Sequence, residues 1–327
     1  MRWSKTVLIA VATAAALATV TPANAATTGT TAARETTATT VPITAAGGYN
    51  SDPSSTPAAG KHTRALGAAI TVPAGQTRYL SSKLNVDDAA QVTEVSHLIY
   101  CRRPNTTANV AQLVSGQNVL ANTATTLLTR GFVTAPADSA LTCALYAQFV
   151  NHAANVAGHL SVLGSSYLQD VYGPITAVKQ TFNTKILVNS TATANTVSFT
   201  APAGAISVQA IGDLNITVCY GADNGLCQRS QGARMSAGDS LVGTQLVVNQ
   251  LNAAGQVCHT STNGALAGTT VTSTVHHYKI NTWLTNVPVQ PNCSRDFVVY
   301  TRVTANAAHN SFLIEANNQS VGAAFTP

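Results

Sequence analysis

Six cysteines carry the clearest chemistry in this sequence. Their even number, in a chain with the export features described below, favours disulfide bonds over free thiols. No Cys-x-x-Cys pair occurs and the spacings are irregular for zinc, so we expect no metal site. The sequence therefore predicts three disulfides, formed by Cys101, Cys143, Cys219, Cys227, Cys258 and Cys293.

The positions of the cysteines favour one set of pairs. Cys101 and Cys143 are alone in the first half of the chain, and we expect them to bond to each other. Cys219 and Cys227 flank a turn-rich loop that suits local closure, which leaves Cys258 for Cys293. Sequence alone leaves other pairings of the last four cysteines open.

Gly238-Asp239-Ser240-Leu241 matches the signature of an esterase family whose serine is the nucleophile. That chemistry needs the serine near the start of an α/β domain and a histidine to accept its proton. Here Ser240 lies deep in a β-rich half, and the companion Asp-x-x-His motif is missing from the sequence. We therefore expect a turn between strands and no enzyme, and a secreted hydrolase using Ser240 stays an alternative.

The other titratable residues form no recognisable site. His276 and His277 are adjacent in a predicted strand, where consecutive side chains point to opposite faces. Asp87-Asp88 is the one adjacent acidic pair, and it lacks the spacing of a calcium loop. No phosphate loop or dinucleotide fingerprint occurs, so no cofactor is expected.

Composition narrows the class of protein. Only 9% of the 327 residues are charged and 45% are hydrophobic, unlike a disordered chain or a coiled coil. The net charge of +5 is spread along the chain, and Arg102-Arg103 is its one adjacent basic pair. A phosphate backbone needs a basic stripe, so nucleic acid is not expected as a partner.

Residues 1–25 have the features of a signal peptide. Arg2 and Lys5 precede an apolar run, and Ala23-Asn24-Ala25 follows it with the small-x-small pattern of a cleavage site. No later apolar segment approaches the roughly 18 residues that span a bilayer. We expect a secreted, extracellular bacterial protein without a membrane partner.

The rest of the chain divides into a tail and two domains. Residues 26–64 are rich in Thr and Ala and contain few large apolar residues, so they predict an extended tail without a core. Short Val-, Ile-, Thr- and Tyr-rich runs follow, broken by Gly, Pro and Asn. The expected class is all-β, with two tandem Ig-like antiparallel β-sandwich domains over residues 65–170 and 184–327; a single larger β domain is the alternative.

Sequence similarity between the halves supports a duplication. Residues 71–75 (TVPAG) recur as residues 200–204 (TAPAG), and 98–101 (LIYC) match 216–219 (ITVC). Residues 145–149 match 299–303, and 159–162 match 310–313 loosely. The matches keep their order, which indicates a tandem repeat.

Within the tail, Thr36–Thr44 is β-prone and uncharged. Such a segment can add as a strand to the sheet of a partner protein. We expect it to be unpaired in the isolated protein and to bind through Thr39, Thr40, Val41, Pro42, Ile43 and Thr44. A flexible spacer is the alternative.

The overall plan, with its Thr-rich N-terminal extension and two cysteine-bearing β domains, resembles the middle, adaptor subunit of the umbrella-shaped toxin particles secreted by Streptomyces. That resemblance implies two partners: a lectin-bearing subunit with a trypsin-like fold, which takes the N-terminal strand, and a large repeat-bearing toxin subunit. We therefore expect a secreted, non-catalytic adaptor in an extracellular assembly. A carbohydrate- or cell-envelope-binding module is an alternative, weakly supported because Trp283 is the sole Trp after the signal segment.

Overall fold

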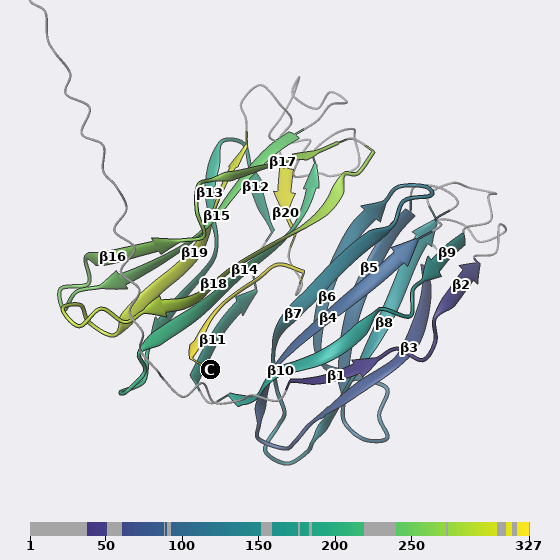
Figure 1. The fold of residues 1–327 in the computed structure, drawn as a ribbon, viewed down its shortest axis with the longest axis horizontal. Coiled ribbons are helices and arrows are strands. Elements are labelled where there is room, and N and C mark those ends of the chain that lie inside the picture. The colour runs from purple at the N-terminus through teal and green to yellow at the C-terminus, as the bar shows by residue number, and fades with distance from the viewer. Residues whose placement is uncertain are drawn as a thin grey trace, which may run out of the picture. The chain divides into compact units, whose positions relative to one another are not determined.

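The computed structural model describes residues 38–50, 61–87, 89, 93–151, 159–175, 177–182, 185–218, 240–272, 274–305, 312–315 and 319–326 (Figure 1). Within these ranges the chain consists of strands and their connections, with no helix and hence none that could span a membrane. Because these elements are all strands, the predicted all-β class is confirmed. The strand pairs of the described ranges are antiparallel, as expected. Residues 36–327 form one compact unit.

The first sandwich consists of two sheets. In one, β1 and β2 form an interrupted edge strand beside β10 and β9, followed by β4 and β7. In the other, the order is β3-β8-β5-β6. The strands are β1 (Thr39–Pro42), β2 (Gly47–Asn50), β3 (Lys61–Val72), β4 (Thr77–Asp87), β5 (Thr93–Arg102), β6 (Asn109–Val119), β7 (Thr125–Thr134), β8 (Leu141–Asn151), β9 (His159–Val162) and β10 (Tyr167–Ile175).

The second sandwich repeats this arrangement strand for strand. β11 and β12 form the interrupted edge beside β21 and β20, followed by β14 and β18, and the other sheet runs β13-β19-β15 and then β16 and β17. The strands are β11 (Ala177–Phe182), β12 (Ile186–Val188), β13 (Thr191–Thr200), β14 (Ser207–Val218), β15 (Ser240–Leu251), β16 (Val257–Thr262), β17 (Ala267–Val271), β18 (His277–Pro288), β19 (Asp296–Ala305), β20 (Phe312–Ile314) and β21 (Val321–Thr326).

The shared strand order identifies the architecture as two tandem jelly rolls. If the interrupted strands are counted once, each sandwich has eight strands in two four-stranded sheets, ordered first-eighth-third-sixth and second-seventh-fourth-fifth. The predicted tandem antiparallel sandwiches are confirmed, but their strand order differs from the Ig-like order that was expected. Alternating apolar residues predict which face a residue occupies, whereas they leave open which strand lies next to which.

The structure confirms two of the four repeat matches. The loose match of 159–162 with 310–313 is not tested in full, because residues 310 and 311 lie outside the described ranges. Residues 71–75 and 200–204 end the equivalent strands β3 and β13, with Gly75 and Gly204 both at positive φ in the turn that follows. Residues 145–149 and 299–303 lie in the equivalent strands β8 and β19. The match of 98–101 with 216–219 is wrong, because the first segment lies in β5, whereas residues 216–218 of the second lie in β14, which corresponds to β4.

The predicted boundaries of the tail and the domains need correction. The first sandwich begins at β1 rather than at residue 65, and the second begins at β11 rather than at residue 184. Ile43, between β1 and β2, is 7% exposed and belongs to the core of the first sandwich. The Thr-rich composition of residues 26–64 concealed this, because main-chain pairing with β9 and β10 depends little on side-chain type.

Buried charged groups lie where the two sandwiches meet. Arg130 of β7 donates to both carboxylate oxygens of Asp213 of β14, at 3.0 and 2.8 Å, and to the carbonyl of Thr282 at 2.9 Å. The side chains of Arg130 and Asp213 are only 5% and 0% exposed. Trp283 lies with its ring centroid 4.6 Å from the Arg130 guanidinium. The ion pair therefore links the two halves with little access to water.

Aromatic residues extend this junction. Phe132 of β7 lies 4.9 Å from Tyr79 of β4 and 4.8 Å from Phe325 of β21, measured between ring centroids. The side chain of Gln180 in β11 forms two hydrogen bonds with the main chain of Phe132. Its Oε1 accepts from the Phe132 N–H at 2.7 Å, and its Nε2 donates to the Phe132 carbonyl at 3.2 Å. The junction thus combines apolar burial with satisfied main-chain groups.

Two of the three predicted disulfides lie within the described ranges, and both are confirmed. Cys101 and Cys143 face each other across β5 and β8, and both are fully buried. Cys258 of β16 bonds Cys293 in the β18–β19 connection, at the surface. The predicted partners Cys219 and Cys227 lie outside the described residues.

Candidate binding surfaces

The predicted partner-binding segment is paired within the chain itself. Residues 39–42 form β1 at the edge of a sheet, in register with β10, so that Thr39 lies opposite Asp170 and Pro42 opposite Tyr167. The expectation of an unpaired segment is therefore wrong. A role of these residues in binding a partner stays a prediction.

The geometry of this edge limits how a partner strand could pair with it. The N–H of Ile43 donates to the Ser166 carbonyl at 3.2 Å, so alternation along the strand directs the N–H of Thr40 and the ring nitrogen of Pro42 away from β10. Pro42 has no N–H to give, and this protects the open edge. Thr44, which is exposed, already donates its N–H to the Leu66 carbonyl at 2.9 Å. A partner strand would thus find Thr40 as the available donor of β1.

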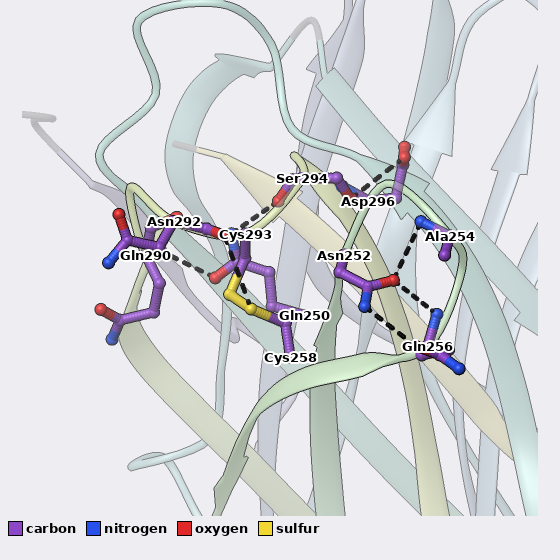
Figure 2. Close-up of a disulfide and its surroundings, with 10 residues drawn as sticks. All are labelled: Gln250, Asn252, Ala254, Gln256, Cys258, Gln290, Asn292, Cys293, Ser294 and Asp296. Carbon is purple, nitrogen blue, oxygen red and sulfur yellow. Dashed lines mark hydrogen bonds between the residues drawn. A yellow bond between two sulfur atoms is a disulfide. The ribbon is translucent and has the colours of Figure 1, made fainter.

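A second candidate surface is the end of the second sandwich that carries the surface disulfide. We call residues 201–206, 251–257 and 289–295 the tip. Its three connections touch one another: the Ser294 N–H donates to the Leu251 carbonyl at 2.7 Å, and the Val289 N–H donates to the Ile206 carbonyl at 2.9 Å. The Cys258–Cys293 bond ties β16 to one of these connections (Figure 2).

Side chains at the base of the tip fix its shape. Gln250, which is buried, donates to the carbonyls of Ser294 at 2.6 Å and Gln290 at 3.2 Å, and accepts from the Gln290 N–H at 2.8 Å (Figure 2). In the β15–β16 hairpin, Asn252 Oδ1 accepts from the N–H groups of Ala254 and Gln256, both at 2.9 Å. Loops held in this way lose little conformational freedom when a partner binds.

Arg295 holds the remaining connection of the tip. Its guanidinium donates to the carbonyls of Ala201 at 2.9 Å and Ala205 at 2.8 Å, and also to that of Pro202. The fixed loops present two strongly exposed aliphatic side chains, Ile206 at 66% and Val257 at 57%. The tip therefore offers apolar contacts on a preorganised frame.

A cluster of Tyr100, Arg102 and Tyr146 lies on the outer face of the β3-β8-β5-β6 sheet. The two tyrosine rings are 5.2 Å apart, and the Arg102 guanidinium lies 5.6 Å from the Tyr100 ring and 5.5 Å from the Tyr146 ring. Burial raises the pKa of the Tyr100 phenol, while the charge of Arg102 opposes that rise. The cluster is not among the sites predicted from the sequence, although the two-residue spacing of Tyr100 and Arg102 places them on one face of a strand.

Within the described ranges, Ser240 and the His276–His277 pair lie in no recognisable catalytic set. Ser240 begins β15, where its backbone pairs with that of Val271, while Gly238 and Asp239 lie outside the described residues. His276 precedes β18 instead of lying in it, and its ring centroid is 4.2 Å from that of His277. The prediction that these two side chains point apart is wrong, because it required both residues to be in an extended strand. Across the described ranges, no three His, Cys, Asp or Glu residues gather as metal ligands would.

His97 and Ser82 form a hydrogen-bonded pair that is closed to solvent. His97 Nε2 lies 2.7 Å from Ser82 Oγ, and both residues are fully buried. Burial, together with the positive charge of Lys279, lowers the pKa of His97 to about 3. Lys279 itself is buried, which lowers its pKa to about 8, and its ammonium donates to the Gln319 carbonyl at 2.7 Å. A substrate has no path to this pair, which is therefore structural.

The neutral His97 predicts acid sensitivity. Its pKa in the folded state, about 3, lies below the ordinary value of 6.5, so between these pH values the unfolded chain binds the proton and the folded chain does not. Stability should therefore fall as pH falls from about 6.5 towards 3, by up to about 1.4 kcal/mol per pH unit from this residue. Urea unfolding at several pH values should give a shallower pH dependence for His97→Gln. If the free energy of unfolding depends on pH equally steeply in the unmodified chain and in His97→Gln, His97 is not a source of acid sensitivity.

Comparison with known proteins gives little guidance. No protein-family model matches the chain, and no curated protein matches it. Solved structures that share a loose likeness include the VP2 subviral particle of infectious bursal disease virus, at 10% identity over 88% of this chain and 76% of that chain, with a TM-score of 0.24. The T13 particle of the same virus gives 11% identity, the same coverage and a TM-score of 0.20. Likeness at this level supports no conclusion about fold or function, and the jelly-roll assignment depends on strand pairing alone.

Proposed function

We propose that this protein is a secreted, non-catalytic adaptor that joins other proteins in an extracellular assembly. The tip carries this proposal, because three connections are fixed by Gln250, Asn252 and Arg295 while Ile206 and Val257 stay exposed. Binding surfaces on scaffold proteins commonly lie on loops held by a β framework. The confirmed disulfides are compatible with an extracellular location.

The N-terminal edge strand is the second surface of this adaptor. Its exposed residues lie on the first sandwich, whereas the tip belongs to the second, so one chain offers separate surfaces to two partners. The particle implied by the sequence resemblance is a toxin assembly used in bacterial competition, in which a lectin-bearing subunit takes the N-terminal strand. Because β1 is paired with β10, such a partner could bind in one of two ways. Its strand would pair with the open edge of β1 through the N–H of Thr40, or it would displace β1 from β10.

The test is capture of secreted partners by tagged variants of the full chain, added to supernatant of cells that lack the native copy. Ile206→Asp with Val257→Asp should abolish capture of one partner, whereas Leu120→Asp, a change at another exposed aliphatic residue, should have no effect. Thr40→Lys should weaken capture of a different partner, because a charge on an edge strand opposes pairing. Thr193→Lys, an exposed change on the edge strand β13, is its control. Unchanged capture by all the variants would contradict the adaptor function.

Carbohydrate binding is the second candidate, and Trp283 is the observation that favours it. This side chain is 54% exposed, although Arg130 packs against its ring. Aromatic side chains that are exposed on a sheet can support a sugar ring through their apolar faces. Binding to a glycan array that is lost in Trp283→Ala would favour this function over the adaptor.

A further inference from the structure

We propose that the outer face of the β3-β8-β5-β6 sheet binds an acidic segment of a partner protein through Tyr100, Arg102 and Tyr146. This inference deepens the proposed adaptor function and rests on it. The site lies on the first sandwich and shares no residue with the tip or with the N-terminal edge strand.

The contacts of Arg102 hold its guanidinium in a defined position. Arg102 Nε donates to Asn109 Oδ1 at 2.7 Å, and its Nη1 donates to the Tyr146 hydroxyl at 3.4 Å. A guanidinium has five N–H donors, so these bonds leave three for a ligand. The guanidinium lies within 5.6 Å of both tyrosine rings, which are in contact with each other, and these contacts limit its movement. The site is therefore partly organised before a ligand arrives.

The charge balance at this face points to an anionic ligand. Among the described residues no carboxylate forms an ion pair with Arg102, whereas the neighbouring Arg103 is paired with Asp138 at 2.9 Å. The cluster thus carries one positive charge that no carboxylate in the described part of the chain balances by an ion pair. A carboxylate matches the planar fork of a guanidinium and can accept two hydrogen bonds from it.

The surrounding residues leave room for a protein segment. The strand register places Ala144 beside Tyr100, Thr142 beside Arg102 and Gln112 on the other side of Tyr100. Small uncharged side chains let a partner approach closely, and the amide of Gln112 can bind its main chain. Tyr and Arg within a rim of weakly interacting residues are typical of the energetic centre of a protein interface.

The orientation of the rings favours a peptide over a sugar. The planes of Tyr100 and Tyr146 are inclined by 48°, so they offer no common flat platform for a sugar ring. An aliphatic or aromatic side chain next to an Asp or Glu can instead fill the angle between the rings while its carboxylate meets Arg102. An acidic segment with adjacent apolar residues is the chemistry that fits.

Labelled short peptides with Asp or Glu between Leu or Phe residues are the probe, with matched Asn or Gln peptides as the neutral set. Fluorescence anisotropy with the full secreted chain should show preference for the acidic set. Arg102→Gln should weaken that binding by about tenfold or more, equivalent to about 1.4 kcal/mol. Tyr146→Ala should also weaken it. Arg302→Gln, which removes an exposed arginine of β19 in the second sandwich, should leave it unchanged.

Three results would overturn the inference: no binding of any acidic peptide at millimolar concentration, equal binding of the acidic and neutral sets, or unchanged binding by Arg102→Gln. Binding of polygalacturonate through Arg102 without binding of acidic peptides would also overturn it, in favour of an acidic saccharide. Circular dichroism confirms that each variant is folded. If Arg102→Gln captures every partner as well as the unmodified chain does, this site is rejected and the adaptor function stands, whereas absence of any captured partner for the unmodified chain would reject the adaptor function itself.

Discussion

Asp213→Asn should destabilise the protein by about 3–5 kcal/mol, because it leaves the Arg130 guanidinium buried without a counter-charge. The side chains of Arg130 and Asp213 are almost inaccessible to water, so solvent cannot replace the lost partner. Chemical denaturation followed by circular dichroism would measure the change in the free energy of unfolding. This is the largest effect that we expect from a single substitution in the described residues.

Two controls show whether the effect comes from burial of the charge. The combined change Arg130→Met with Asp213→Leu should cost less than Asp213→Asn alone, since it removes both charges and keeps apolar volume. Asp138→Asn, which breaks the exposed pair with Arg103, should change the stability little, because solvent screens that pair. A loss for Asp213→Asn no greater than that for Asp138→Asn would show that the ion pair does not stabilise the junction.

Removing the Cys101–Cys143 disulfide should lower the free energy of unfolding by an amount comparable to that of Asp213→Asn. The bond closes a loop with a sequence separation of 42, for which chain entropy gives about 4 kcal/mol of stabilisation. Cys101→Ala with Cys143→Ala would also leave a small cavity, because both side chains are fully buried between the sheets. The unfolding midpoint in urea should therefore shift strongly downwards.

The surface disulfide is the matched comparison. Cys258→Ala with Cys293→Ala opens a loop of similar separation, 35, but removes sulfur atoms that lie near the surface. Its cost should be smaller than that of the buried bond, and its main consequence should be weaker capture of the partner that binds the tip. A larger loss of stability from the surface pair would contradict the assignment of the buried bond to the core.

Local patterns in the sequence predict much of the fold. The Val-, Ile- and Thr-rich runs predict strands, and the recurrent TVPAG and TAPAG turns reveal the duplication, because a turn with positive φ strongly selects glycine. The strand order is a long-range property, which the period of two along each strand does not encode. For the same reason residues 98–101 and 216–218 look alike in sequence although they lie in the non-equivalent strands β5 and β14.

The candidate surfaces were harder to predict than the fold. Thr36–Thr44 is predicted to be β-prone, and Thr39–Pro42 within it forms β1, but the sequence does not reveal that β10 of the same chain supplies its partner strand. The shape of the tip depends on the hydrogen bonds that Gln250 donates to the carbonyls of Gln290 and Ser294. These partners are 40 and 44 positions further along the chain, so local sequence patterns do not reveal them. The two-residue spacing of Tyr100 and Arg102 predicts that they share one face of a strand. The position of Tyr146 beside them follows only from the register between β5 and β8, which the sequence does not reveal.

The adaptor function is tested most directly by the state of the chain in the supernatant of the cells that secrete it. A tagged copy expressed from its native locus, cross-linked gently and separated by size before mass spectrometry, should elute with at least one other secreted protein in a constant ratio. Ile206→Asp with Val257→Asp should release one of those proteins from the complex. If the unmodified chain elutes alone at the size of a monomer, with no other protein at a constant ratio, the proposed adaptor function is wrong.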